Sequence, residues 1–211
     1  EGHIDVLVNN AGIGDLRFIE KTTDELAHAM FETNVHGALR CMRAVLPGMR
    51  ERRSGTIVNI SSVAGHVAGM GGGLYAATKH ALGAITESAA LETRPFGIRF
   101  ALIEPGFFDT PILGKAQASL AIDDASPYAV GERRIAAIYA SGGGDPIEVA
   151  QAIEHAITTD SPKLRYLVGA TAKPFAEGRA NITDEEWVDF GREMPEEEFW
   201  AEFARIFPMP A

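Results

Sequence analysis

The sequence predicts an α/β fold with a doubly wound parallel sheet, covered by helices on both faces and so built in three layers. Two observations predict it. Apolar runs rich in Val and Ile recur at residues 4–8, 56–60 and 98–103, a pattern typical of strands buried on both faces. Long helical patterns lie between these runs. Strands that alternate with helices at this spacing are joined by crossover connections, so we expect them to be parallel.

The first helix is expected at residues 22–53. Thr22 and Glu25 have the spacing of a capping box, and Ser54-Gly55 follows as a stop signal. Asn34 and Gly37 both weaken a helix and hint at a local distortion. On the helix alone, the simpler interpretation of Asn34 is a polar residue that faces solvent. An apolar stripe recurs at steps of three and four residues: Phe31, Val35, Leu39, Met42, Leu46 and Met49.

The most informative stretch is residues 55–79, where a strand, a serine pair and a glycine-rich loop lead into a helix expected from Tyr75 to about residue 95. Tyr75 and Lys79 are one turn apart on the same helix face. An ammonium near a phenol favours the phenolate, and the Ser62 hydroxyl could hold a substrate oxygen during proton transfer. A Tyr-x-x-x-Lys pair alone is more often a surface pair. The serine at the strand end favours the catalytic interpretation.

Composition limits the class of protein. The chain has 211 residues, of which 46% are hydrophobic, which is enough for one domain with a sizeable core. The net charge of −10 argues against nucleic acid and anionic membrane as partners. Cys41 is the only cysteine, no apolar run is long enough to span a membrane, and the start lacks a signal-peptide pattern. We therefore expect a cytoplasmic protein without a disulfide, and we identify no metal site.

The second half of the chain is expected to continue the domain to residue 170. Residues 107–130 have no clear period, so we expect an irregular loop that forms a substrate lid, with Phe107, Phe108 and Leu113 on the substrate. Asp145-Pro146 predicts a helix start, and residues 165–169 a strand. Residues 171–211 are expected to be a helical extension of the same domain, with helix starts at Thr183 and Pro195. Ten acidic residues and three arginines from residue 175 onward predict solvated helix faces.

Residues 4–169 resemble the short-chain dehydrogenase/reductase family. Asn9-Asn10-Ala11-Gly12 looks like the family's turn after its central strand. Pro105, Gly106 and Thr110 look like its segment that contacts the nicotinamide. The family's catalytic tetrad falls on Asn34, Ser62, Tyr75 and Lys79. Each motif is weak alone, whereas their order and spacing together are specific.

The resemblance implies a Rossmann-like fold and an oxidoreductase that uses NAD or NADP. Tyr75 would be the acid/base, Lys79 would lower its pKa and hold the nicotinamide ribose, and Ser62 would position the substrate oxygen. Asn34 would distort its helix so that a backbone carbonyl holds a water. The implied cofactor-binding residues are Asn10, Ala11, Gly12, Tyr75, Lys79, Pro105, Gly106 and Thr110.

The resemblance also suggests a substrate class and an assembly. The apolar segment and acidic tail are similar to the branch that acts on steroids, retinoids and other lipophilic alcohols or ketones. Relatives form homodimers or homotetramers through the two long helices, here those that begin near Thr22 and Tyr75.

The chain departs from the family at its start. No glycine-rich turn precedes Ile4, and the glycines at 69–73 follow a different strand. Three βα units are expected to be missing, roughly 75 residues at ~25 each. Two alternatives stay open: a truncated fold that acts as a binding or scaffold protein, and a sugar-nucleotide epimerase or dehydratase. The second is disfavoured because the Asn-Asn-Ala-Gly turn suits single-domain dehydrogenases.

Overall fold

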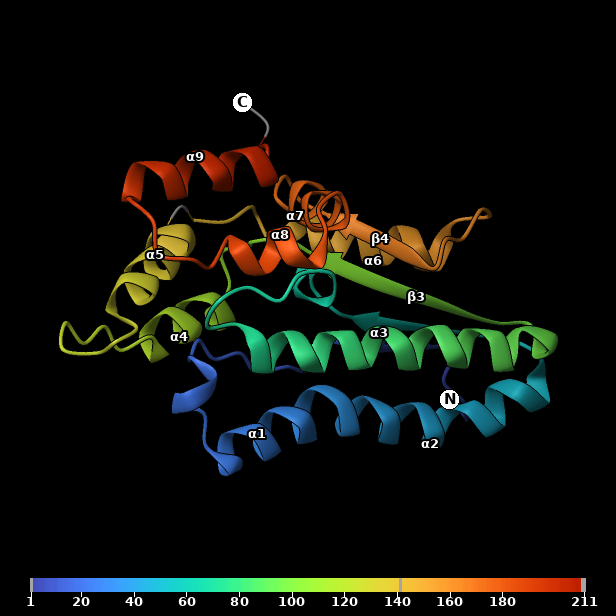
Figure 1. Cartoon of the computed structure of the whole chain (residues 1–211). Coiled ribbons are helices and arrows are strands. Elements are labelled where there is room, and N and C mark those ends of the chain that lie inside the picture. The colour runs from blue at the N-terminus through green and yellow to red at the C-terminus, as the bar shows by residue number, and fades with distance from the viewer. Residues whose placement is uncertain (1, 141, 210–211) are drawn as a thin grey trace.

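A parallel sheet forms the centre of the molecule (Figure 1). The structure, a computed structural model, describes residues 2–140 and 142–209. The strand order is β1-β2-β3-β4, and every neighbouring pair is parallel. The predicted α/β fold is therefore confirmed. The strands are β1 (Val6–Asn9), β2 (Gly55–Ile60), β3 (Ile98–Pro105) and β4 (Arg165–Val168).

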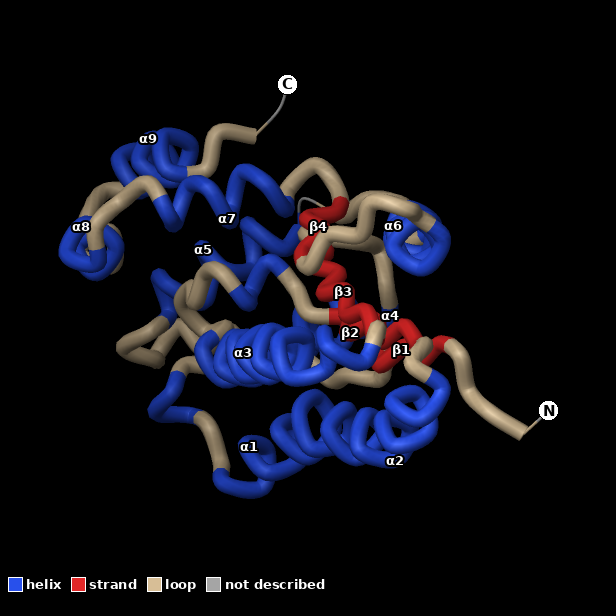
Figure 2. The backbone as a smooth tube through the Cα atoms, turned by 90° about the vertical axis from the view of Figure 1, so that its right-hand side faces the viewer, coloured by secondary structure: helices blue, strands red, loops and turns tan. Residues whose placement is uncertain are grey.

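Helices cover both faces of the sheet, which gives the three layers expected (Figure 2). Successive residues of a strand point to opposite faces, so Ile57 packs against α2 (Gly37–Arg52) and α3 (Gly73–Thr93). Its neighbour Val58 packs on the other side, against α6 (Ile147–Thr158). The apolar β-branched runs thus form strands because both of their faces are buried.

The predicted first helix consists of three segments. α1 (Asp24–Phe31) and α2 flank a π-helical turn, η2 (Glu32–His36). The distortion suggested by Asn34 and Gly37 is confirmed. The predicted N-cap is one residue off, because Thr23 is the N-cap and its hydroxyl accepts a hydrogen bond from the Leu26 backbone N–H at 3.2 Å. Leu26 has no polar side chain with which to complete the predicted capping box.

The prediction of an irregular loop over residues 107–130 is wrong. α4 (Pro111–Ser119) lies within it, α5 (Ala129–Ala140) follows, and only residues 120–128 between them lack a helix. Pro111 suits a first helical turn, where a missing N–H costs nothing. Within α4 only Ala116 is buried, and one buried residue leaves no period for sequence reasoning to detect.

The C-terminal residues form three helices, which lie together in Figure 1: α7 (Ala172–Ala180), α8 (Asp184–Asp189) and α9 (Glu196–Ile206). The capping box at Thr183 and Glu186 is present as predicted. The apolar faces of these helices pack on Val63 and Val67 of the segment after β2, while the acidic residues of the first turn of α9 are exposed. Within the residues that the structure describes, no helix is long and apolar enough to cross a membrane.

Candidate active site

A cavity of about 960 Å³ opens at the carboxyl ends of the strands. This is the edge at which doubly wound sheets bind their ligands. Its walls come from the turn after β1, the end of β2, the first turns of α3 and the end of β3. Eight of the predicted catalytic and cofactor-binding residues line it together: Asn10, Gly12, Ser62, Tyr75, Lys79, Pro105, Gly106 and Thr110. Ala11 does not line it and is exposed.

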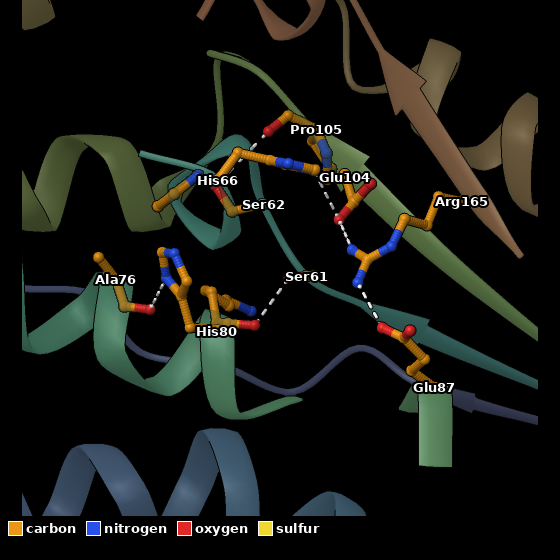
Figure 3. Close-up of polar contacts among 11 residues, drawn as sticks. Ser61, Ser62, His66, Ala76, His80, Glu87, Glu104, Pro105 and Arg165 are labelled. Atoms are coloured by element: carbon orange, nitrogen blue, oxygen red, sulfur yellow. Dashed lines mark hydrogen bonds and ion pairs between the residues drawn. The ribbon is translucent and has the colours of Figure 1, made fainter. Parts of the chain in front are cut away.

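Ser62 lies where β2 ends and a short 3-10 turn, η3 (Val63–Gly65), begins. Its Oγ accepts a hydrogen bond from the Ala64 backbone N–H at 3.1 Å and donates to the Pro105 carbonyl at 3.5 Å (Figure 3). The Ser62 side chain also lies near enough to Tyr75 to lower the pKa of the phenol, and both residues line the cavity. The structure therefore brings together the serine and the tyrosine that the sequence singled out.

Burial governs the acidity of the Tyr75 phenol. Loss of solvation raises its pKa to about 12, and the nearby Ser62 side chain acts in the opposite direction. The lowering expected from Lys79 is not seen in this structure. The Lys79 ammonium donates to the Ile60 carbonyl at 2.8 Å and lies 5.4 Å from the centre of the Tyr75 ring. Burial also lowers the pKa of Lys79 to about 8.

Asn34 is buried, with 2% of its surface exposed, so the interpretation as a solvent-facing residue is wrong. Its Oδ1 accepts from the Ile13 backbone N–H at 2.8 Å, and its Nδ2 donates to the Ile13 carbonyl at 2.9 Å. Nδ2 also donates to Thr78 Oγ1 at 3.0 Å. Asn34 therefore ties the segment after β1 to α3, a role that sequence reasoning missed. The predicted water-holding carbonyl stays a prediction.

Of two glycines at this site, Gly106 is required by a close approach and Gly12 is not. A Cβ on Gly12 would lie 3.8 Å from Lys79 Nζ and 3.4 Å from Asn34 Oδ1. A Cβ on Gly106 would lie only 2.1 Å from Thr171 Oγ1, so no other residue fits there without a shift. Thr171 Oγ1 also accepts from the Phe107 backbone N–H at 2.8 Å. The segment after β3 is thus held firmly beside the cavity.

The three predicted substrate residues differ in their surroundings. Phe107 and Leu113 line the cavity and are partly exposed. Phe108 borders it too, but only 5% of its surface is exposed and it belongs to the core between the sheet and α6. Gly169 makes room for its ring, since a Cβ there would lie 2.6 Å from Phe108 Cζ. The protein itself therefore covers most of the Phe108 ring.

Sequence reasoning also missed most of the apolar wall. Aromatic side chains from α5 and the C-terminal helices line the cavity, and several of them stack on one another. The available signal was the helical spacing of aromatic residues after residue 186. These lining residues are Tyr139, Phe175, Trp187, Phe190, Phe199, Phe203 and Phe207. Among the described residues no group of His, Cys, Asp and Glu is arranged to hold a metal ion.

A doubly wound sheet with a serine, a tyrosine and a lysine at its carboxyl edge defines a Rossmann-type oxidoreductase fold. Residues 1–121 match the family model described as short chain dehydrogenase. A second, independent match is the crystal structure of a short-chain dehydrogenase from Streptomyces avermitilis, with 38% sequence identity and a TM-score of 0.74. The match covers 92% of this chain and 72% of that one. The chain belongs to the short-chain dehydrogenase family.

Two further relatives are informative. Human retinol dehydrogenase 8 is 39% identical over 177 residues, which are 78% of this chain. The chain spans only 56% of the length of that relative. A short chain dehydrogenase from Burkholderia cenocepacia J2315, solved in complex with NADP, is 25% identical with a TM-score of 0.67. That match covers 91% of this chain and 70% of the other.

Proposed function

We propose that the protein is an NAD(P)-dependent oxidoreductase that interconverts a secondary alcohol and a ketone, with Tyr75 as the acid/base. One observation carries the proposal: Ser62, Tyr75 and Lys79 line the same cavity at the carboxyl ends of the strands. A hydroxyl, an ionisable phenol and an ammonium are the groups that proton transfer to and from a substrate oxygen requires. Family membership supports the same reaction class.

The residues of the cavity fit the nicotinamide half of the cofactor. Lys79 lines the cavity, and its Nζ would be a donor for ribose hydroxyls. Gly106 and Thr110 would contact the nicotinamide, with Asn10 at the far wall. The NADP complex of the Burkholderia relative supports this choice of cofactor. When bound, the cofactor would supply or accept the hydride.

The protein's own groups would handle the proton. Ser62 Oγ would hold the substrate oxygen next to the Tyr75 hydroxyl. With a pKa of about 12, the free phenol is protonated at neutral pH and can donate its proton in the direction of ketone reduction. Alcohol oxidation needs the phenolate, which a charged group close to the phenol oxygen would have to stabilise. Asn34 would hold the segment after β1 and helix α3 in fixed positions next to Ser62 and Tyr75.

A lipophilic substrate suits the cavity wall. Phe107, Leu113 and the C-terminal aromatic residues offer apolar surface, and burial of apolar area contributes about 25 cal/mol per Å². Human retinol dehydrogenase 8 is named for a lipophilic alcohol, which supports this class. We further propose that residues 1–170 act as part of a dehydrogenase domain, that residues 107–130 cover the substrate, and that residues 171–211 extend the same domain.

We also propose a homodimer or homotetramer formed through α2 and α3. Leu91 on α3 is 75% exposed, which leaves an apolar residue for a partner copy to cover. Light scattering at micromolar concentration tests this directly. A monomer would contradict it.

The function is tested with the full-length protein, NADH or NADPH, and a panel of small and bulky ketones. The proposal expects oxidation of one cofactor molecule for each alcohol formed, followed by absorbance and product analysis. An isomerised product with unchanged cofactor would instead identify an epimerase. No cofactor binding in a fluorescence titration would favour a binding or scaffold protein.

A further inference from the structure

A buried carboxylate lies directly behind the Ser62 turn. Glu104 is the residue before Pro105 in β3, and none of its surface is exposed. Arg165 Nη1 donates to Glu104 Oε1 at 2.6 Å, and His66 Nε2 lies 2.9 Å from the same oxygen. Figure 3 shows His66 and Arg165 reaching Glu104 from opposite sides. Neither His66 nor Glu104 lines the cavity among the described residues.

The contact with His66 is not needed to balance the charge of Glu104. A buried carboxylate must be paired, and the Arg165 guanidinium already does this from β4. Arg165 also reaches Glu87 on α3 at 3.4 Å, which leaves the network with more than one acidic partner. The imidazole therefore adds a second contact to a carboxylate that already has a cation.

The contact between His66 and Glu104 is not aligned as a hydrogen bond, so it contributes little to stability by itself. Although the two atoms are close, His66 Nε2 makes no well-aligned hydrogen bond within the described part of the chain, and Glu104 Oε2 makes none either. Buried polar groups without partners cost stability and are uncommon, so each one requires an explanation. A role in holding a neighbouring segment explains why the pair is present.

The neighbouring segment is the turn that carries Ser62. The turn is closed by hydrogen bonds from the Gly65 N–H to the Ser62 carbonyl and from the His66 N–H to the Val63 carbonyl, both 2.8 Å. Its first residue donates through Oγ to the Pro105 carbonyl, and its last contacts Glu104 through the imidazole. Two successive residues of β3 therefore hold the turn at both ends.

The end of β3 is a firm anchor for this turn. The Gly106 N–H donates to the Val168 carbonyl of β4 at 2.9 Å, and Arg165 of the same strand holds the Glu104 side chain. We propose that Glu104 and His66 are positioning residues that set the place of Ser62 Oγ at the cavity. This inference rests on the proposed function, in which Ser62 holds the substrate oxygen. Neither residue touches the substrate, so both act only through Ser62.

A double-mutant cycle in the full-length protein tests this. His66→Gln and Glu104→Gln each replace one partner of the contact by a neutral amide with little change in size, and each should lower kcat about ten- to a hundredfold, as small displacements at an active site do. The KM for the cofactor should change by less than about twofold, since the cofactor contacts are elsewhere. In a Ser62→Ala background, His66→Gln should change kcat by less than about twofold, because the residue through which it acts is gone.

Glu87→Gln is the matched control. It removes a carboxylate from the far, exposed end of the same network, so kcat should not change. A second readout is independent of activity: the Ala64 amide donates to Ser62 Oγ, and its hydrogen exchange should be faster in His66→Gln and Glu104→Gln but not in Glu87→Gln. If Glu104→Gln does not fold, His66→Gln carries the test, because the His66 side chain is 28% exposed.

Three outcomes would overturn the inference, and they distinguish its failure from that of the proposed function. An equal loss of kcat from His66→Gln with and without Ser62, or unchanged Ala64 exchange in a folded variant, would show that the pair does not act through Ser62. If Ser62→Ala alone leaves kcat unchanged, the proposed role of Ser62 is itself wrong, and the inference fails with it.

Discussion

Asn34 and Thr78 are joined by a hydrogen bond of 3.0 Å although they are 44 residues apart in the sequence. Thr78 lies on α3 between Tyr75 and Lys79, and its own hydroxyl donates to the Tyr75 carbonyl at 2.7 Å. The π-helical turn η2 carries the Asn34 amide that makes this bond. The distortion of the first helix is therefore linked directly to the backbone of the candidate catalytic helix.

Asn34→Ala should lower the free energy of unfolding by about 1–3 kcal/mol, because it removes two hydrogen bonds to the Ile13 backbone and the buried one to Thr78. Urea unfolding measures this. Asn34→Asp is the informative comparison, since it keeps the acceptor for the Ile13 N–H and loses the donor to Thr78. Equal stability of Asn34→Ala and the parent would show that the hydrogen bonds of Asn34 contribute nothing to the free energy of unfolding.

The titration of Lys79 should make the free energy of unfolding depend on pH. Its pKa falls from 10.5 to about 8 on folding, so between these values the unfolded chain binds more protons than the folded one. The free energy of unfolding should therefore rise with pH from about 8 to about 10. Above that range, Tyr75 contributes in the opposite direction, since its pKa is raised from 10.0 to about 12.

Lys79→Met is the control for this effect, because it removes the titrating group and keeps an apolar chain of similar length. The free energy of unfolding of the variant minus that of the parent should fall as the pH rises from about 8 to about 10, because only the parent gains stability there. In activity assays, the same variant should need a higher pH for alcohol oxidation. If the free energies of unfolding of the variant and the parent change in parallel from pH 8 to 10, the pKa of Lys79 is not lowered by burial.

Substitutions of Leu113 and Phe108 can be compared to test which of the two side chains contacts the substrate. Leu113→Ala should raise the KM for bulky apolar ketones more than for small ones and leave stability nearly unchanged, because this side chain is partly exposed on the cavity. Phe108→Ala should instead cost about 3–5 kcal/mol of stability, as expected for a buried ring. Michaelis profiles and unfolding curves separate the two. The reverse pattern would place Phe108, and not Leu113, on the substrate.

The sequence was sufficient to predict the sheet, and that Ser62, Tyr75 and Lys79 lie at one cavity, because both depend on local patterns. Runs such as residues 56–60 are typical of buried strands, and the spacing of Ser62, Tyr75 and Lys79 is set by one strand and one helix. Long-range relationships could not be predicted. Phe108 is buried by Gly169, and Asn34 by Ile13 and Thr78, so no local pattern reports either burial. The raised pKa of Tyr75 likewise depends on the whole cavity.

The central claim is that Tyr75 transfers the proton, and Tyr75→Phe in the full-length protein tests it most directly. Loss of the hydroxyl should lower kcat by about a hundred- to ten-thousandfold, the usual contribution of a general acid or base. Cofactor affinity and melting temperature should stay close to those of the parent. Tyr139→Phe is the comparison, since this second cavity tyrosine also has its pKa raised to about 12 by burial. Its effect on kcat should be far smaller. A Tyr75→Phe variant that keeps kcat within about tenfold of the parent would contradict the account.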